Sequence, residues 1–224
     1  MNNKNNKYDR LLWVLTVILV LIGIAIVVRR LLFLNALHNY VPGSTQSRSP
    51  VPDAGFAEHP LLTLIHIVPG LVFMLLAPLQ LSKKIRSQYP RFQRVTGNIV
   101  LACGLTIGST ALVMGFIMAI GGLTETLAVA VFGTAFLFSI VKAWIYIRKK
   151  EMVLYREWMI RVLAIGLAVS TTRPVVALFF ATSRLTGLTV QQYFGVAFWI
   201  AFTLHVTVAE IWIRYTAKKT MAGR

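Results

Sequence analysis

Five ionisable side chains interrupt otherwise apolar stretches of this sequence, and these residues are the best placed to do chemistry. They are His66, Lys142, Arg173, His205 and Glu210. An ionisable group is costly in apolar surroundings, so each of them is a candidate ligand-binding residue. Arg173 is charged at every physiological pH, so it should face protein or water. An anion, a quinone-like carbonyl or a chain of water molecules would suit it, and a structural partner is the alternative.

The positions of the five residues along their stretches predict two sites at different depths. If each apolar stretch is a helix that crosses a membrane, His66 lies roughly 8 Å and Arg173 roughly 15 Å below the outer end of its helix. We expect these two side chains to share one cavity with Ser170 and Thr172.

Near the opposite boundary, Lys142 and Glu210 both lie roughly 6–9 Å inside. At that depth the two side chains can pair with each other. The alternatives are that Glu210 pairs with Arg214 one turn later and that Lys142 extends to the headgroups.

The four histidines and the single cysteine do not specify a metal or a haem. His66 and His205 differ in depth by roughly 10 Å, which is poor for two ligands of one haem iron. His38 and His59 could join His66 at an outer metal site, but no ligand spacing supports it. Cys103 lies alone in an apolar run, where a buried structural thiol is expected. The sequence leaves any cofactor unknown.

The composition places these residues in a membrane. Of the 224 residues, 57% are hydrophobic and 13% are charged, whereas soluble domains are nearer a quarter charged. The net charge of +16 could suggest nucleic acid, but the cations form short clusters between long apolar runs. That arrangement is typical of membrane proteins, and it favours contact with anionic lipid headgroups over nucleic acid.

The hydropathy pattern predicts an all-α bundle of six membrane-spanning helices. A span needs about 20 mostly apolar residues, and no stretch alternates as a membrane barrel strand does. The expected transmembrane domain is 11–214, with spans at 11–34, 61–81, 96–120, 125–148, 158–183 and 190–214. Residues 1–10 and 215–224 are expected to be tails, and the loop at about 35–60 is rich in proline, glycine and serine. A cleaved signal peptide is the alternative for the first span.

The basic residues predict the orientation. Cytoplasmic loops of membrane proteins carry an excess of lysine and arginine. Here most cations fall in the N-terminal tail, in 83–94, in 148–161 and in the C-terminal tail. We therefore predict that both termini lie in the cytoplasm, with the chain in the inner membrane of a bacterium.

Five short segments resemble a known family. They are 59–70 (HPLLTLIHIVPG), 77–80 (APLQ), 156–161 (REWMIR), 172–174 (TRP) and 209–213 (AEIWI). Together they are similar to the bacterial predicted membrane proteins known as domain of unknown function 2306, over about 58–214.

The resemblance implies a multi-helix membrane fold, and it carries no assigned activity. It implies that His66, Arg173 and Glu210 occupy motif positions of the family. Members commonly have histidine where this chain has Gln93 and Tyr155. If the family binds a metal or haem there, this chain lacks two candidate ligands.

Three functions follow as hypotheses. The first is binding or transport of a small molecule or ion at an intramembrane polar site formed by the five ionisable residues. The second is a membrane redox protein that uses haem or quinone. The third is a non-catalytic subunit, either a homo-oligomer or the partner of another membrane protein. No Walker loop, GxGxxG, CxxC, HExxH or GxSxG motif is present, so the sequence favours a protein that is not an enzyme.

Overall fold

The computed structural model describes residues 3–38 and 54–222, which are helical apart from short turns. Six helices in this part of the chain are long and apolar enough to cross a membrane, so the predicted six-span all-α architecture is confirmed. The elements in order are α1 (Asn3–His38), α2 (Ala54–Glu58), α3 (Pro60–Leu76), the 3-10 helix η1 (Pro78–Leu81), α4 (Lys83–Gln88), α5 (Pro90–Ile117), α6 (Gly122–Arg148), α7 (Met152–Thr186) and α8 (Val190–Ala222).

Proline and glycine set several of these boundaries. Pro60, Pro78 and Pro90 each occupy the first turn of a helix, where the missing N–H of proline costs nothing. At the end of α7, Gly187 adopts a left-handed conformation with φ of 67° and donates its N–H to the carbonyl of Ser183 at 2.8 Å. Glycine accepts that backbone conformation without strain.

The helices extend beyond the spans expected from hydropathy. α5 begins at Pro90 rather than near 96, and α7 begins at Met152 rather than near 158. Hydropathy detects only the part of a helix that lies in hydrocarbon, whereas the backbone hydrogen bonds continue into the headgroup region. The loop expected at 35–60 is also shorter, because α1 continues to His38 and α2 occupies 54–58. The proline- and serine-rich remainder, 39–53, lies outside the described residues.

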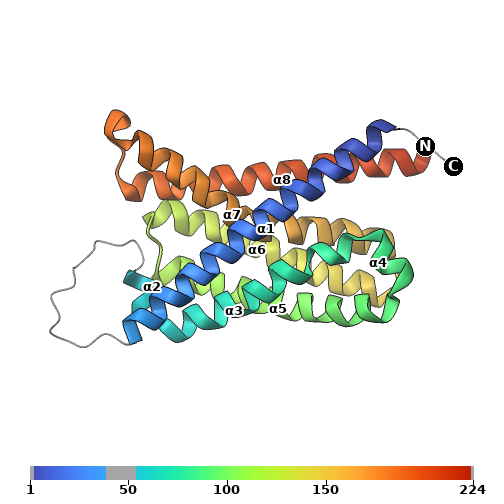
Figure 1. The fold of residues 1–224 in the computed structure, drawn as a ribbon, viewed down its shortest axis with the longest axis horizontal. Helices are drawn as coiled ribbons and strands as arrows, with labels where there is room; N and C mark the ends of the chain where they lie inside the picture. Colours follow the sequence, from blue (N-terminus) through green and yellow to red (C-terminus); the bar gives the residue numbers. More distant parts are fainter. Residues whose placement is uncertain (1–2, 39–53, 223–224) are drawn as a thin grey trace.

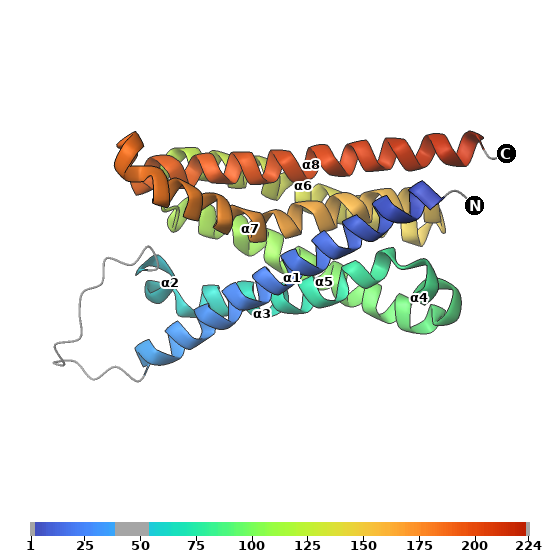
Figure 2. The same cartoon turned by 45° about the horizontal axis from the view of Figure 1, so that its top comes forward.

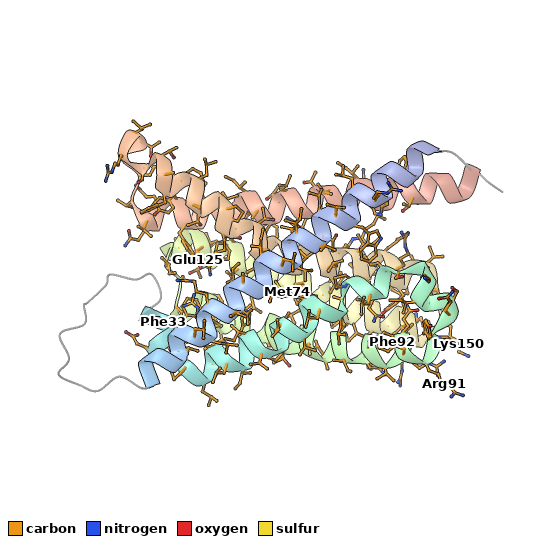
Figure 3. The ribbon with its side chains drawn as sticks, in the orientation of Figure 1. Phe33, Met74, Arg91, Phe92, Glu125 and Lys150 are labelled. Carbon is orange, nitrogen blue, oxygen red and sulfur yellow. The ribbon has the colours of Figure 1, made fainter. Side chains whose placement is uncertain are left out.

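Both chain termini lie at one end of the bundle, together with α4 (Figure 1). We call this end the terminal end and the opposite end the distal end. In Figure 3, Arg91, Phe92 and Lys150 lie at the terminal end, and Phe33 and Glu125 lie toward the distal end. The arrangement agrees with an even number of spans and gathers basic connections at one end.

Small residues bring the helices close together. A Cβ atom added to Gly108 of α5 would lie 2.5 Å from the nearest Leu137 side-chain atom of α6, and one added to Gly104 would clash with Ile140. Gly104 and Gly108 thus form a GxxxG step at the contact of α5 with α6. At the distal end, a Cβ on Gly121 would meet the Gly195 backbone nitrogen at 2.5 Å, so the start of α6 and α8 touch almost backbone to backbone.

α1 packs against the bundle differently from the other spans. It crosses diagonally over the other helices, from the side of α8 at the terminal end to the side of α3 at the distal end (Figures 1 and 2). Its most extensive contacts are with α3 and α7. Only 11% of the most apolar stretch of α1 is buried inside the protein, against 28–39% of the corresponding stretch in each of the other five spans.

Candidate functional site

A cavity of about 240 Å³ lies inside the bundle. Its lining comes from all six spanning helices and from α2, and it reaches from Met74, near the middle of the bundle, to Glu125 near the distal end (Figure 3). Most of the lining is apolar. Ligand pockets commonly combine apolar walls with a few placed polar groups, so the polar lining residues decide what the cavity can bind.

Five polar side chains line the cavity, contributed by four helices. They are Arg30 of α1, His66 of α3, Glu125 of α6, and Ser170 and Arg173 of α7. The structure thus brings three side chains expected to share a cavity, His66, Ser170 and Arg173, to one place. Whether they bind a ligand stays a prediction.

His66 is oriented by α5. Its Nδ1 lies 2.9 Å from Thr110 Oγ1, and that hydroxyl lies 2.7 Å from the carbonyl oxygen of Thr106. A threonine hydroxyl has one proton, which it gives either to the helix carbonyl or to the ring. The tautomer of the imidazole decides whether Nδ1 donates to Thr110 or accepts from it.

Glu125 is held at the start of α6. The N–H of Gly121 donates to Glu125 Oε2 at 2.6 Å, which satisfies a backbone donor at the helix N-terminus. The carboxylate also interacts electrostatically with Arg173, whose guanidinium carbon lies 5.9 Å from the ring centre of Phe194. A carboxyl group from α6 and a guanidinium from α7 thus both line the distal half of the cavity.

Arg30 closes the distal corner between α1 and α2. Its side chain is only 4% exposed, and its guanidinium carbon lies 3.7 Å from the ring centre of Phe56. That geometry is a close cation–π contact. The sequence indicated only that a cation stands inside an apolar run. It did not reveal that Phe56, 26 positions later, returns on a short helix to cover it.

Ser170 is the polar group of the cavity that most needs a partner. Its side chain is fully buried, and its hydroxyl has no hydrogen-bond partner among the residues that the structure describes. It lies against α1, since a Cβ on Gly23 would stand 2.9 Å from Ser170 Oγ. Buried polar atoms are rarely unsatisfied in native proteins, so a ligand or a water molecule is expected to complete it.

Glu210, another predicted site residue, forms a separate pair with Arg161. Arg161 Nε donates to Glu210 Oε1 at 2.5 Å, and its Nη2 donates to Oε2 at 3.0 Å. The expected partners of Glu210 were Lys142 and Arg214, and both expectations are wrong. The true partner is Arg161, 49 positions earlier on α7, because the rotation of α7 turns Arg161 toward α8. Lys142 lies with its Nζ 5.4 Å from the Phe138 ring centre.

The Arg161–Glu210 pair borders a second cavity of about 230 Å³, nearer the terminal end. Lys142 is not among the residues described as lining it. His205 lies elsewhere again, with Nε2 2.7 Å from Thr171 Oγ1 on α7.

The histidines therefore face different neighbours. His66 bonds α5 and His205 bonds α7, an arrangement that does not present both rings to one iron. Among the described residues, no three His, Cys, Asp or Glu side chains come together as a metal site. The side chain of His38, one member of the outer metal hypothesis, lies outside them.

The two positions where the family resemblance implies histidine come together in the structure. Gln93 Nε2 donates to the Gln80 carbonyl at 3.2 Å, and the Tyr155 hydroxyl lies 3.5 Å from Gln80 Oε1. Gln80 Nε2 also donates to Thr96 Oγ1 at 2.8 Å. All four side chains are buried. This chain therefore fills that position with a network of amide and hydroxyl hydrogen bonds.

The comparison with known proteins agrees with the motif-based resemblance. A family model described as "Predicted membrane protein (DUF2306)" matches residues 63–213, which is more than half of the chain. No curated protein and no solved structure gives a significant match. The matched range holds His66, Arg173 and Glu210 but leaves α1 outside. The chain therefore belongs to the DUF2306 family of predicted membrane proteins.

Proposed function

We propose that this protein binds a small molecule in the cavity of about 240 Å³ that reaches Glu125, here called the distal cavity, and carries it across the membrane. The observation that carries the proposal is the fully buried Ser170 hydroxyl, which lines the cavity and has no hydrogen-bond partner within residues 3–38 and 54–222. Around it stand charged side chains from α1, α6 and α7 in otherwise apolar walls. Such a lining suits a largely apolar molecule with one polar end, because the walls would take the apolar part and the charges would fix the polar part.

The second cavity supports transport over simple binding. Ile165 lines both cavities, and the rings of Phe132 and Phe202, one from each cavity, stack at 5.1 Å. All three side chains are nearly buried. Two cavities at different depths with a thin apolar partition fit a protein that alternates access by moving α8 against α6 and α7.

The binding proposal can be tested by filling the cavity. We expect protein purified with its native lipids to carry a small molecule that mass spectrometry detects after solvent extraction. Ala111→Phe, on the cavity side of α5, should lose that molecule, and Ala102→Phe, on the exposed side of the same helix, should keep it. Circular dichroism would establish that both variants are folded. If the two variants retain the molecule equally, or if wild type carries none, the proposal fails.

We also propose that the protein lies in the cytoplasmic membrane of a bacterium with both termini inside. The support is that both termini, Arg91 and Lys150 lie at one end of the bundle (Figure 3), where the rule on basic residues expects the cytoplasm. In a Cys103→Ser background, a membrane-impermeant maleimide should label Leu185→Cys in intact cells and Lys150→Cys only after permeabilisation. The reverse pattern would overturn the orientation.

A further inference from the structure

α1 forms one wall of the distal cavity between α3 and α7. α3 and α7 touch where a Cβ on Gly166 would meet the Phe73 ring at 2.6 Å. Toward the distal end, the two helices face each other across the cavity, and α1 crosses this gap with Gly23, Ile26, Val27 and Arg30 in its lining (Figure 2). α1 is thus the part of the wall that stands between the cavity and the bilayer.

The distal end of the cavity is covered, whereas its side reaches the protein surface. At the distal end the guanidinium of Arg30 lies on the ring of Phe56 of α2, and Gly55 packs near Met118 at the end of α5. On the side, Val169 of α7 lines the cavity and is 37% exposed. A surface-exposed valine in a spanning helix borders lipid. The cavity therefore reaches the bilayer-facing surface at Val169, next to Ser170, which lies against α1.

The charges that line the cavity favour an anion. Among the described lining residues, Arg30 and Arg173 contribute two guanidinium groups and Glu125 contributes one carboxylate, so guanidinium groups outnumber carboxylates there. Guanidinium groups bind carboxylate and phosphate through paired hydrogen bonds. The Ser170 hydroxyl can donate one more bond to the same oxygen atoms.

Apolar side chains from α3, α6 and α8 continue the cavity toward the middle of the bundle. Phe73 and Met74 of α3, Phe136 of α6 and Phe202 of α8 line this part. An alkyl chain that moves here from the bilayer exchanges lipid contacts for contacts with these side chains, so it stays in apolar surroundings. The cavity therefore has a cationic end beside Arg30 and Arg173 and an apolar end beside Phe73.

From these observations we propose that the ligand is an amphiphilic monoanion, with one carboxylate or phosphate group on an alkyl tail, and that it enters from the bilayer beneath α1. This inference rests on the proposed function, since it names the chemical class that the distal cavity takes. The anionic head lies between Arg30 and Arg173, and the tail lies along Phe73 and Phe136.

Three probes of equal chain length test the charge preference. Dodecanoate, dodecanol and dodecylamine would be titrated into the full chain in lipid nanodiscs, with binding followed by native mass spectrometry. We expect dodecanoate to bind about tenfold more tightly than dodecanol, and dodecylamine to bind least. Ala111→Phe should reduce binding of all three probes.

Charge variants separate this inference from the proposed function. Arg173→Gln should weaken dodecanoate binding about tenfold, Glu125→Gln should strengthen it, and Arg184→Gln, outside the cavity lining, should leave it unchanged. If the three probes bind equally and Ala111→Phe weakens the binding of each, the anion preference is overturned and the proposed function stands. Failure of every probe to bind, with no co-purified molecule, would overturn both.

A cross-link tests the entry route. In a Cys103→Ser background, Gly23→Cys and Met74→Cys would place two thiols at the contact of α1 with α3, where Gly23 lies against the Met74 sulfur. Oxidation should slow dodecanoate binding about tenfold or more, and reduction should restore the rate. An unchanged rate in the verified cross-linked protein would refute entry beneath α1.

Discussion

The Arg161–Glu210 pair should couple α7 to α8 strongly enough to measure. Its two hydrogen bonds are charge-assisted and bidentate, and the guanidinium carbon lies 4.5 Å from the ring centre of Trp158. We predict that Arg161→Met and Glu210→Gln each destabilise the protein, because each leaves the other charge in a spanning helix without its counter-ion. The double variant should recover part of the loss.

The magnitude follows from the geometry and the exposure of the pair. A hydrogen bond to a charged group contributes about 1.5–3 kcal/mol, and two such bonds join these side chains. The side chains are 23% and 35% exposed, so headgroups and water screen part of the interaction. We therefore expect a coupling energy of about 2 kcal/mol, which corresponds to roughly a 30-fold change in the folding equilibrium.

The assay is a double-mutant cycle on unfolding by sodium dodecyl sulfate in mixed micelles, followed by circular dichroism. Lys142→Met is the matched control, because it also removes a cation from a spanning helix. The ammonium group of Lys142 lies over the ring of Phe138. The substitution should change the free energy of unfolding by less than about 1 kcal/mol. A coupling energy near zero would refute the reasoning and indicate that lipid headgroups hold the two charges separately.

Three further predictions concern packing and polar contacts, all measured in the same unfolding assay. Gly195→Ala should cost about 1–3 kcal/mol, because its Cβ would meet a backbone nitrogen at 2.9 Å. Gly70→Ala, whose Cβ would have its nearest neighbour at 3.9 Å, should cost nothing. Equal effects of the two substitutions would contradict the close approach of α6 and α8. Gln80→Leu should cost about 1–3 kcal/mol, because buried Thr96 loses the amide donor of Gln80 and the buried Tyr155 hydroxyl loses its oxygen acceptor. Gln88→Leu at an exposed site should be near neutral. His205→Leu should cost about 1 kcal/mol by removing its 2.7 Å contact with α7, and a stabilised variant would count against that contact.

The number and order of the spans could be predicted because one strong physical rule governs them. A bilayer requires each crossing segment to be apolar and helical for its full width. Pro60 was likewise predictable as the first residue of α3, since proline suits that position. The helical rise put His66 and Arg173 in the same half of the membrane, roughly 8 Å and 15 Å from one boundary, and the two residues do line one cavity.

The partners of charged residues could not be predicted, because they depend on how each helix is rotated. Glu210 pairs with Arg161 across two helices, although Arg214 is nearer in sequence. Depth alone gave Lys142 and Glu210 the same level and said nothing of which faces meet. The contact of Arg30 with Phe56 was missed for the same reason. Phe56 lies on α2, a helix of five residues that comes after residues 39–53 in the sequence.

The charges of the distal half call for an explanation that membrane orientation does not supply. An excess of basic residues at the terminal end fits the placement of loops in the cytoplasm. Arg30 and Arg173 lie instead in the other half of the bundle and line a cavity. One of them, Arg30, belongs to α1, which the family match does not include. The matched region thus provides His66, Glu125, Ser170 and Arg173, and α1 completes the wall with a second guanidinium. A chain without α1 would have an open cavity with one guanidinium and one carboxylate among its described lining residues, so the anion preference proposed for this protein depends on α1, and Arg30→Gln should remove it while the cavity remains.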